Sequence, residues 1–520
     1  KELCEEEFND WYEKYQKAVC TVEGREKALQ EVAELIEKDL SLLGVTGVED
    51  RLQDQVPETI MCLREAGIRI WMLTGDKVGT AREIAASAGL LGSDSGILEI
   101  SEEMCTNITE IKKRLFSICR TLNIEFESEE RKISRIPLKI MGKNKREEEQ
   151  ESKDISIIID GAMLGQIFSG SLGNVDIENG NYESNSYMKR FNEILSNVHS
   201  IEKLFVQICC KCHTVIFARF APSQKGNIVR IVRKHMDEIT LAIGDGANDC
   251  NMIQTANVGV GVRGLEGNQA FLTADYGITA FKDLKPLLLI HGRLSYRRIC
   301  KLALYMFYKN FTVGIPVFIY GYFTLWSGTR LYFDYWYQVY NVILSSVPII
   351  VVSVFDFDVP KRESLLNPKL YRYGPENKFL NIRVCFYYLL NSLWHIFIVF
   401  TLPYILFSVN STNAFGSNQS VVGATIYYLI ILVVNIKVLL MADHIHYLLG
   451  FSVVFSLFSW ICTLFVCTSS FSIGSDVYSL WIPLYNNVLL WISLISGLSL
   501  SLWPDYFLKV VSSELVKIKN

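Results

Sequence analysis

The stretch LAIGDGANDCNMIQTANVGVGV, residues 241–262, decides the fold of the first 290 residues. An apolar run ends in the acidic glycine loop GDGAND, a helical segment follows, and a second apolar run, VGVGV, comes next. This order is typical of a doubly wound α/β domain, in which the loops after parallel strands meet at one crevice. We therefore expect Asp245 and Asp249 at the rim of a parallel sheet.

A second stretch, GIRIWMLTGD (residues 67–76), follows the same scheme. It is an apolar run that ends in a turn, and the helical pattern TAREIAASAGL comes after it and closes at Gly89. The two acidic loops are expected to face one another. The charged tract 141–154 and the Gly-, Asn- and Ser-rich tract 168–187 between them predict surface insertions near 93–153 and 168–200.

The composition changes near residue 300. The chain has 520 residues, 50% of them hydrophobic, and its mean hydropathy of +0.22 is high for an ordinary soluble protein. A membrane-crossing helix needs about 20 apolar residues. Six stretches are long enough, near 302–326, 336–355, 383–408, 420–441, 447–468 and 482–503. The sequence therefore predicts a water-exposed α/β part followed by an all-α bundle of six transmembrane helices.

Charge distribution predicts the topology. The segment between the second and third predicted spans carries six basic residues, which places it on the cytosolic side and both chain ends with it. These residues are Lys361, Arg362, Lys369, Arg372, Lys378 and Arg383. Residues 1–300 are thus expected in the cytosol, where the 13 scattered cysteines would stay reduced. With 51 basic and 55 acidic residues, net charge gives no case for binding nucleic acid.

The acidic loop suits a divalent cation. Asp245 and Asp249 lie four residues apart around a Gly-Ala-Asn turn, so both carboxylates can reach one hard cation. Magnesium prefers one or two carboxylates together with phosphate oxygens, which predicts a magnesium site here. The alternative is a solvated acidic hairpin.

The TGD loop can be interpreted in two ways. Starting at Asp76, DKVGT is close to DKTGT, in which an aspartate is phosphorylated; starting at Thr74, TGDK is a separate loop that organises phosphate and metal. In DKVGT, Val78 stands where DKTGT has a hydroxyl, and valine has no donor for phosphate. This favours the second interpretation, in which Asp76 is not the nucleophile.

The motifs as a series resemble a known family. TGD, ARFAPSQK and GDGAND are similar to the phosphorylation-domain signatures of P-type ATPases, which belong to the haloacid dehalogenase superfamily. IIIDGAML, LAIGDGANDCNMIQTANVGVGV, HGRLSYRRICKLALYMFYKN and LLNPKLYRYG narrow the resemblance to the type IV branch, the phospholipid flippases. The resemblance covers almost the whole chain apart from the insertions.

The resemblance implies a domain plan and a missing part. Residues 1–38 would end a nucleotide-binding domain or hinge, 39–290 would form the haloacid dehalogenase-like (Rossmann-like) phosphorylation domain, and 291–520 the membrane domain with the last six of ten helices. The phosphorylated aspartate, the first four spans and the actuator domain are expected to lie outside this sequence. On its own, the chain is not expected to complete the cycle.

The resemblance also implies site residues. Asp245 and Asp249 would hold magnesium, Thr74 would offer a hydroxyl to the phosphoryl group, and Lys225 would neutralise developing charge. ATP would be bound by these loops, with Gly75, Asp76 and Asn248 organising phosphate. Arg219 would pair with nucleotide phosphate, unless it is only a salt-bridged surface residue. Gly79 stands where the family usually has glutamate, which affects details of that helix.

The substrate class is predicted from the membrane part. Cation pumps of this architecture need carboxylates within the bilayer, but the first span carries Lys309 and Asn310, and the second has no central acid. An intramembrane lysine is costly and indicates function, here contact with a lipid phosphate or carboxylate. By resemblance, Lys309 and Asn310 occupy positions tied to lipid transport. The alternative is that Lys309 snorkels to the cytosolic face.

Together these features predict the carboxyl-terminal portion of an ATP-driven phospholipid flippase. It would be a multi-pass protein of the plasma membrane or endomembrane system, with phospholipid as substrate and with a glycosylated two-span accessory subunit as a possible partner. The alternative is a flippase-like regulatory module of a larger protein, as in some protist guanylate cyclases. A soluble-type phosphatase is a third interpretation.

Overall fold

The structure is a computed structural model. It describes residues 2–20, 25–38, 40, 41, 43, 44, 52–92, 96–102, 104, 105, 108–122, 124, 155–168, 191, 194, 195, 198–236, 238–264, 267–409, 419–474 and 477–519. The predicted insertion tract 141–154 lies outside these residues, as does 169–187. The chain forms two compact units, Lys1–Leu52 and Gln53–Asn520.

The first unit contains two helices, α1 (Glu5–Val19) and α2 (Arg25–Ile36). Three glutamates occupy the first turn of α1 and Lys17 its last turn, which complements the helix dipole. The Trp11 Nε1–H group donates to the Val32 carbonyl oxygen at 2.9 Å and ties the two helices together.

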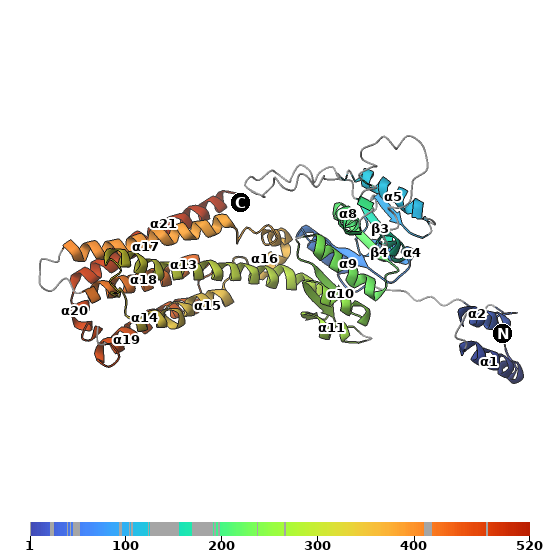
Figure 1. Cartoon of the computed structure of the whole chain (residues 1–520), viewed down its shortest axis with the longest axis horizontal. Coiled ribbons are helices and arrows are strands. Elements are labelled where there is room, and N and C mark those ends of the chain that lie inside the picture. Colours follow the sequence, from blue (N-terminus) through green and yellow to red (C-terminus); the bar gives the residue numbers. More distant parts are fainter. Residues whose placement is uncertain are drawn as a thin grey trace. The chain divides into compact units, whose positions relative to one another are not determined.

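The second unit begins with an α/β region built on two parallel sheets (Figure 1). One has the strand order β1-β4-β3-β2 and the other β5-β6-β7, and every pairing is parallel. The strands are β1 (Trp71–Leu73), β2 (Gly96–Ile100), β3 (Ile155–Asp160), β4 (Thr214–Ala218), β5 (Leu241–Gly244), β6 (Val258–Val262) and β7 (Tyr276–Ile278). The predicted doubly wound α/β region is confirmed at this level.

Helices connect and cover these strands. They are α3 (Val56–Glu65), α4 (Val78–Ser87), α5 (Ile108–Thr121), α6 (Gly161–Phe168), α8 (Val198–Lys211), α9 (Pro222–His235), η3 (Ala247–Asp249), α10 (Cys250–Thr255), α11 (Gln269–Thr273), η4 (Phe281–Asp283) and α12 (Leu284–Pro286). The central strands β3 and β4 read ISIIID and TVIFA, so apolar side chains emerge on both faces. Separate apolar clusters form on the two sides, one with Ile157, Ile159 and Phe217 and one with Ile158 and Ile216.

The prediction of six membrane spans is confirmed among the described residues. By length and composition they are Phe281–Phe323, Asp334–Phe355, Ile382–Ser408, Gln419–Met441, Tyr447–Ser469 and Val488–Val511. The helices that form them are η5 (Leu287–Gly292), α13 (Arg293–Phe323), α14 (Asp334–Val339), η6 (Tyr340–Leu344), α15 (Ser346–Phe355), α17 (Ile382–Val409), α18 (Gln419–Met441), α19 (Tyr447–Ser469) and α21 (Val488–Lys519). The connecting helices are α16 (Lys361–Leu366), η7 (Pro368–Tyr373) and α20 (Trp481–Tyr485).

The sixth span lies farther along the chain than predicted. Residues Trp481–Tyr485 form the separate short helix α20, and α21 begins after Asn487, whose Oδ1 accepts from the Leu489 N–H at 3.0 Å. This side-chain cap explains the boundary, because the first N–H groups of a helix need acceptors. Asp505, placed beyond the predicted span, therefore lies inside it.

The loop between the second and third spans contacts the α/β region. The Arg372 Nε–H group of η7 donates to the Glu65 carbonyl oxygen at 3.0 Å, at the end of α3. This contact places the basic loop on the same side of the membrane as the α/β region, in agreement with the predicted topology.

Candidate functional site

The TGD loop follows directly from strand β1. The Thr74 N–H still continues the sheet, because it donates to the Phe217 carbonyl oxygen of β4 at 2.9 Å. Beyond it the chain turns: Thr74 Oγ1 donates to Asp76 Oδ2 at 2.6 Å, and the Asp76 N–H donates back to Thr74 Oγ1 at 3.1 Å. The loop is thus closed on itself, with Gly75 at its tip and the Asp76 side chain exposed.

The loop after strand β4 lies against the TGD loop. The Phe220 N–H donates to the Thr74 carbonyl oxygen at 3.0 Å, and the Arg219 N–H donates to the Asp76 carbonyl oxygen at 2.8 Å. Helix α9 starts two residues later at Pro222, a residue suited to the first helical turn. Because α9 is anchored here, it carries Lys225 to the rim of the sheet.

Lys225 meets the acidic loop after strand β5. Its Nζ atom donates to Asp249 Oδ1 at 2.8 Å, and Lys225 is 9% exposed. A Cβ atom at Gly244 would lie 2.6 Å from Asp249 Oδ2, so only glycine lets this carboxylate fold back over the end of β5. Leu73, which precedes Thr74, packs against the apolar cluster of Ala242 and Met252. The structure thus brings the TGD, lysine and GDGAND motifs to one rim.

The donor set at this rim fits magnesium. Asp245 and Asn248 are exposed, and Lys225 bonds to Asp249 through only one of its carboxylate oxygens, Oδ1. Among the described residues no group of three or more His, Cys, Asp and Glu side chains gathers as a metal site. A site with two carboxylates, completed by water and phosphate oxygens, is the arrangement magnesium prefers.

Arg219 has a partner that was not predicted. Its Nη1 atom lies 3.2 Å from Asp160 Oδ2 and 3.4 Å from Glu102 Oε2. Asp160 is fully buried at the carboxyl end of β3, and Arg219 adopts the left-handed backbone conformation with φ +53° at the end of β4. The run IIID followed by glycine, an apolar strand ending in an acid, is the sequence signal that identifies Asp160.

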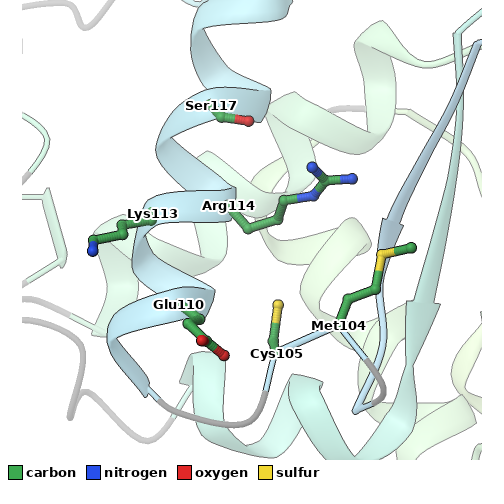
Figure 2. Close-up of a pocket in the computed structure, with 6 residues that line it drawn as sticks. All are labelled: Met104, Cys105, Glu110, Lys113, Arg114 and Ser117. Atoms are coloured by element: carbon green, nitrogen blue, oxygen red, sulfur yellow. The ribbon is translucent and has the colours of Figure 1, made fainter.

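A surface pocket lies elsewhere in the α/β region (Figure 2). It has a volume of about 450 Å³ and is lined by Met104, Cys105, Glu110, Lys113, Arg114 and Ser117. Burial raises the pKa of the Cys105 thiol, with the Glu110 carboxylate adding to the effect, so the thiol is not an activated nucleophile. No residue of the predicted motifs lines this pocket, and we assign it no part in the site.

Lys309 is fully buried in the middle of α13. Its Nζ atom lies 3.0 Å from Ser345 Oγ and 3.5 Å from Ser346 Oγ, and 5.7 Å from the centroid of the Tyr340 ring. The side chain points into the bundle, which contradicts the snorkelling alternative. Asn310, next to it, is exposed on the surface of the described helices.

The serines that face Lys309 follow an irregular turn. Residues Tyr340–Leu344 form the π-helical segment η6, and Ser345 Oγ donates to the Tyr340 carbonyl oxygen at 2.7 Å. Asn435 Nδ2 of α18 donates to the Leu344 carbonyl oxygen at 2.9 Å. These bonds satisfy backbone groups freed at membrane depth, where irregular backbone occurs only against protein or a cavity. The pair SS before proline at 345–348 is the only sequence trace of this arrangement.

Comparison with known proteins gives a consistent result. Residues 271–517 match the family model described as "Phospholipid-translocating P-type ATPase C-terminal". The chain is 32% identical to a phospholipid-transporting ATPase of Schizosaccharomyces pombe over 98% of its length, covering 37% of that protein. It is 35% identical to phospholipid-transporting ATPase DNF1 of Saccharomyces cerevisiae over 85% of the chain and 26% of the relative. It is 34% identical to human phospholipid-transporting ATPase ID over 78% of the chain and 31% of the relative.

The chain therefore spans roughly a third of the length of these relatives, between 26% and 37%. None of these names favours the alternative of a regulatory module. The matches agree with the six spans in describing a multi-pass integral membrane protein.

Proposed function

We propose that this chain is the carboxyl-terminal portion of an ATP-driven phospholipid flippase, because residues 271–517 match the model of the phospholipid-translocating P-type ATPase C-terminal family. Its cytosolic region, residues 1–300, would hold part of the machinery that transfers phosphate from ATP to an aspartate. Its six spans would guide the phospholipid head group. The α/β region would have the haloacid dehalogenase-like fold.

The TGD, lysine and GDGAND loops would form the phosphoryl-transfer site. Thr74 would donate its hydroxyl to a phosphoryl oxygen, while Gly75 lets the backbone approach and Asp76 holds the loop closed. Lys225, kept in place by Asp249 at 2.8 Å, would neutralise charge that develops during transfer. The 2.6 Å bond from Thr74 Oγ1 to Asp76 Oδ2 supports an organising role for Asp76 rather than that of nucleophile.

Asp245 and Asp249 would hold magnesium. Bound there, the ion would supply positive charge that neutralises phosphate oxygens. Asn248, exposed between the two carboxylates, would donate its amide N–H to phosphate.

Arg219 would bind nucleotide phosphate. The buried Asp160 carboxylate holds one end of the guanidinium through Nη1 at 3.2 Å. Because guanidinium presents five donors in a rigid fork, the remaining donors stay available to phosphate oxygens. This arrangement makes Asp160 a positioning residue for Arg219.

The observation that carries the lipid assignment is the environment of Lys309. Its side chain is fully buried, and among the described residues its hydrogen-bond partners are serine hydroxyls, without an ion pair to a carboxylate. A buried cation without a counter-charge is unfavourable, so an anion from outside the bundle would be attracted to it. The phosphate of a phospholipid head group has this chemistry. Asn310, one residue on, would add an amide from the exposed side of α13.

The experiment compares Lys309→Met with Lys509→Met in the protein that carries this chain, reconstituted with the phosphorylated-aspartate segment present. Lys509 is the matched control, because it is a lysine of α21 that donates to the Leu440 and Ala442 carbonyl oxygens rather than to the serines that face Lys309. We expect the phospholipid concentration for half-maximal ATP hydrolysis to rise about tenfold or more for Lys309→Met, the loss of one charge-assisted contact. Lys509→Met should leave it unchanged.

Diacylglycerol, which lacks the phosphate, tests the head-group chemistry and should not stimulate either protein. Equal phospholipid dependence in wild type and Lys309→Met would overturn the assignment. The membrane in which the protein resides, plasma membrane or endomembrane, and a glycosylated two-span accessory subunit remain part of the proposal by resemblance.

A further inference from the structure

A second polar cluster lies inside the membrane bundle, outside the proposed lipid site. It joins four spanning helices, α13, α17, α18 and α21, which pack together in the bundle (Figure 1). We call it the buried polar cluster. Its members are Tyr308, Asn391, His395, Lys437 and Asp505, and each is between 0% and 8% exposed.

The contacts of the buried polar cluster form a closed chain. Lys437 Nζ lies 2.5 Å from Asp505 Oδ2 and donates to Asn391 Oδ1 at 2.9 Å. Asn391 Nδ2 donates to Asp505 Oδ1 at 2.7 Å. His395 Nε2 lies 3.3 Å from Asp505 Oδ2, and His395 Nδ1 lies 2.5 Å from the Tyr308 hydroxyl. The Tyr308 hydroxyl and His395 Nδ1 thus join α13 to α17, and the other ring nitrogen of His395 faces the Asp505 carboxylate.

This cluster is charge-balanced, since one ammonium faces one carboxylate. Buried pairs of this kind add little net stability compared with apolar side chains of the same volume, because desolvation offsets their attraction. What they add is geometry: the contacts among these side chains form in only one relative placement of the helices. The buried polar cluster thus fixes the position of α13 against α17, α18 and α21.

Tyr308 connects this cluster to Lys309. The two residues are consecutive on α13, so their side chains leave the helix about 100° apart. Tyr308 faces His395 of α17, and Lys309 faces Ser345. Any rotation of α13 that moves the Tyr308 hydroxyl also moves the Lys309 ammonium.

Helix α18 completes the link from the other side. Lys437 points into the buried polar cluster, whereas Asn435, two residues earlier, donates to the Leu344 carbonyl oxygen next to Ser345. The Tyr340 hydroxyl donates to the Lys309 carbonyl oxygen at 3.0 Å. The same helix therefore holds both the cluster and the serine turn that faces Lys309.

We propose that the buried polar cluster is a positioning unit that sets the rotation of α13 and so presents Lys309 to the phospholipid phosphate. The proposal rests on the function proposed above, because it assigns Lys309 to lipid. Tyr308 is its critical member, since it joins the cluster to the helix that carries Lys309.

The test removes one hydroxyl at a time from α13. Tyr308→Phe breaks the contact with His395 and keeps the ring. Tyr305→Phe is the matched control: Tyr305 is equally buried on the same helix, and its hydroxyl donates to the Val434 carbonyl oxygen at 3.3 Å, outside the cluster. We expect Tyr308→Phe to raise the phospholipid KM about tenfold, with a smaller change in maximal rate, and Tyr305→Phe to leave KM unchanged.

A second pair of variants keeps the test independent of folding. His395→Gln retains a hydrogen-bonding side chain for the Tyr308 hydroxyl, so its phospholipid KM should stay close to that of the wild type. His395→Leu removes the contact and should raise the phospholipid KM as Tyr308→Phe does. Identical KM values for Tyr308→Phe and Tyr305→Phe, or for the Gln and Leu variants, would overturn the positioning role. If Lys309→Met raises KM and Tyr308→Phe does not, the positioning role alone fails. If Lys309→Met has no effect on KM, the lipid assignment fails.

Discussion

The two buried lysines of the described membrane helices, Lys309 and Lys437, have opposite surroundings. Lys437 is paired with Asp505 at 2.5 Å and with the Asn391 amide at 2.9 Å. Lys309 is buried as deeply but reaches only serine hydroxyls, at 3.0 and 3.5 Å. The first charge is neutralised within the chain, whereas the second has no carboxylate partner among the described residues, which is why we propose that it binds a ligand.

The backbone around the two lysines differs in the same sense. Lys437 belongs to α18, a regular helix whose spanning window is 72% buried. Lys309 faces the place where the second span changes from the π-helical η6 through Ser345 into α15. A regular helix that carries a paired charge is typical of a part of the bundle with fixed geometry. An irregular backbone beside an unpaired charge is typical of a binding site. If Lys309 binds lipid as proposed, then pairing with a carboxylate, rather than burial, separates a structural intramembrane lysine from a functional one.

The largest effect is expected for Lys437→Met. The substitution leaves the Asp505 carboxylate buried and unpaired, which costs about 3–5 kcal/mol of unfolding free energy. Chemical unfolding in detergent micelles measures the loss.

The double variant Lys437→Met with Asp505→Leu provides the control for this prediction. Because it removes both charges, it should regain most of the lost stability. A double variant as unstable as Lys437→Met alone would show that the lysine acts through packing rather than through its charge.

Much of the architecture was predictable from local pattern, and the site only in part. Apolar runs ending in acidic loops predicted the parallel sheets and the two acidic loops at one rim, because such patterns depend on neighbours in sequence. The roles of Thr74 and Lys225 came only from the family resemblance. Asp160 was missed because its importance comes from Arg219 on another strand. Whether magnesium and nucleotide bind as proposed stays a prediction.

The buried polar cluster is a second case in which local sequence patterns did not predict a contact between distant residues. The predicted sixth span ended near residue 503, before Asp505, whereas the structure continues α21 through Pro504 to Lys519. The pairing of Lys437 with Asp505 joins residues from two helices, and no spacing in the sequence encodes it. Composition predicts that a helix crosses the membrane, but which helices pack together decides whether a charge has a partner.

Lys309→Met should have a smaller effect on stability and the opposite sign. Replacing an unneutralised buried cation by an apolar side chain of similar length should raise the unfolding free energy by about 1 kcal/mol or leave it unchanged. The same unfolding assay measures it in the absence of phospholipid. A loss as large as that of Lys437→Met would mean that Lys309 has a structural role, and would remove the contrast between the two lysines.

The smallest effect is expected at the cytosolic end of the bundle, where a paired carboxylate is partly exposed. Asp443 lies 2.5 Å from Lys301 Nζ and 2.7 Å from Arg297 Nη2, and its side chain is 33% exposed. Burial acts to raise the pKa of Asp443, but the two cations outweigh it and hold the pKa below its ordinary value.

Asp443→Asn should therefore cost under about 1 kcal/mol at pH 7, because solvent screens the pair. Since the pKa is lower in the folded than in the unfolded chain, the stabilisation is complete above the unfolded value of about 3.9 and is lost as pH falls through the folded value. The difference in unfolding free energy between wild type and Asp443→Asn should thus be constant from pH 7 to about 5 and shrink below about 4. If the difference in unfolding free energy between wild type and Asp443→Asn grew as the pH fell, the direction of the pKa shift would be wrong. If Asp443→Asn lost as much unfolding free energy as Lys437→Met, exposure to solvent would not weaken this ion pair.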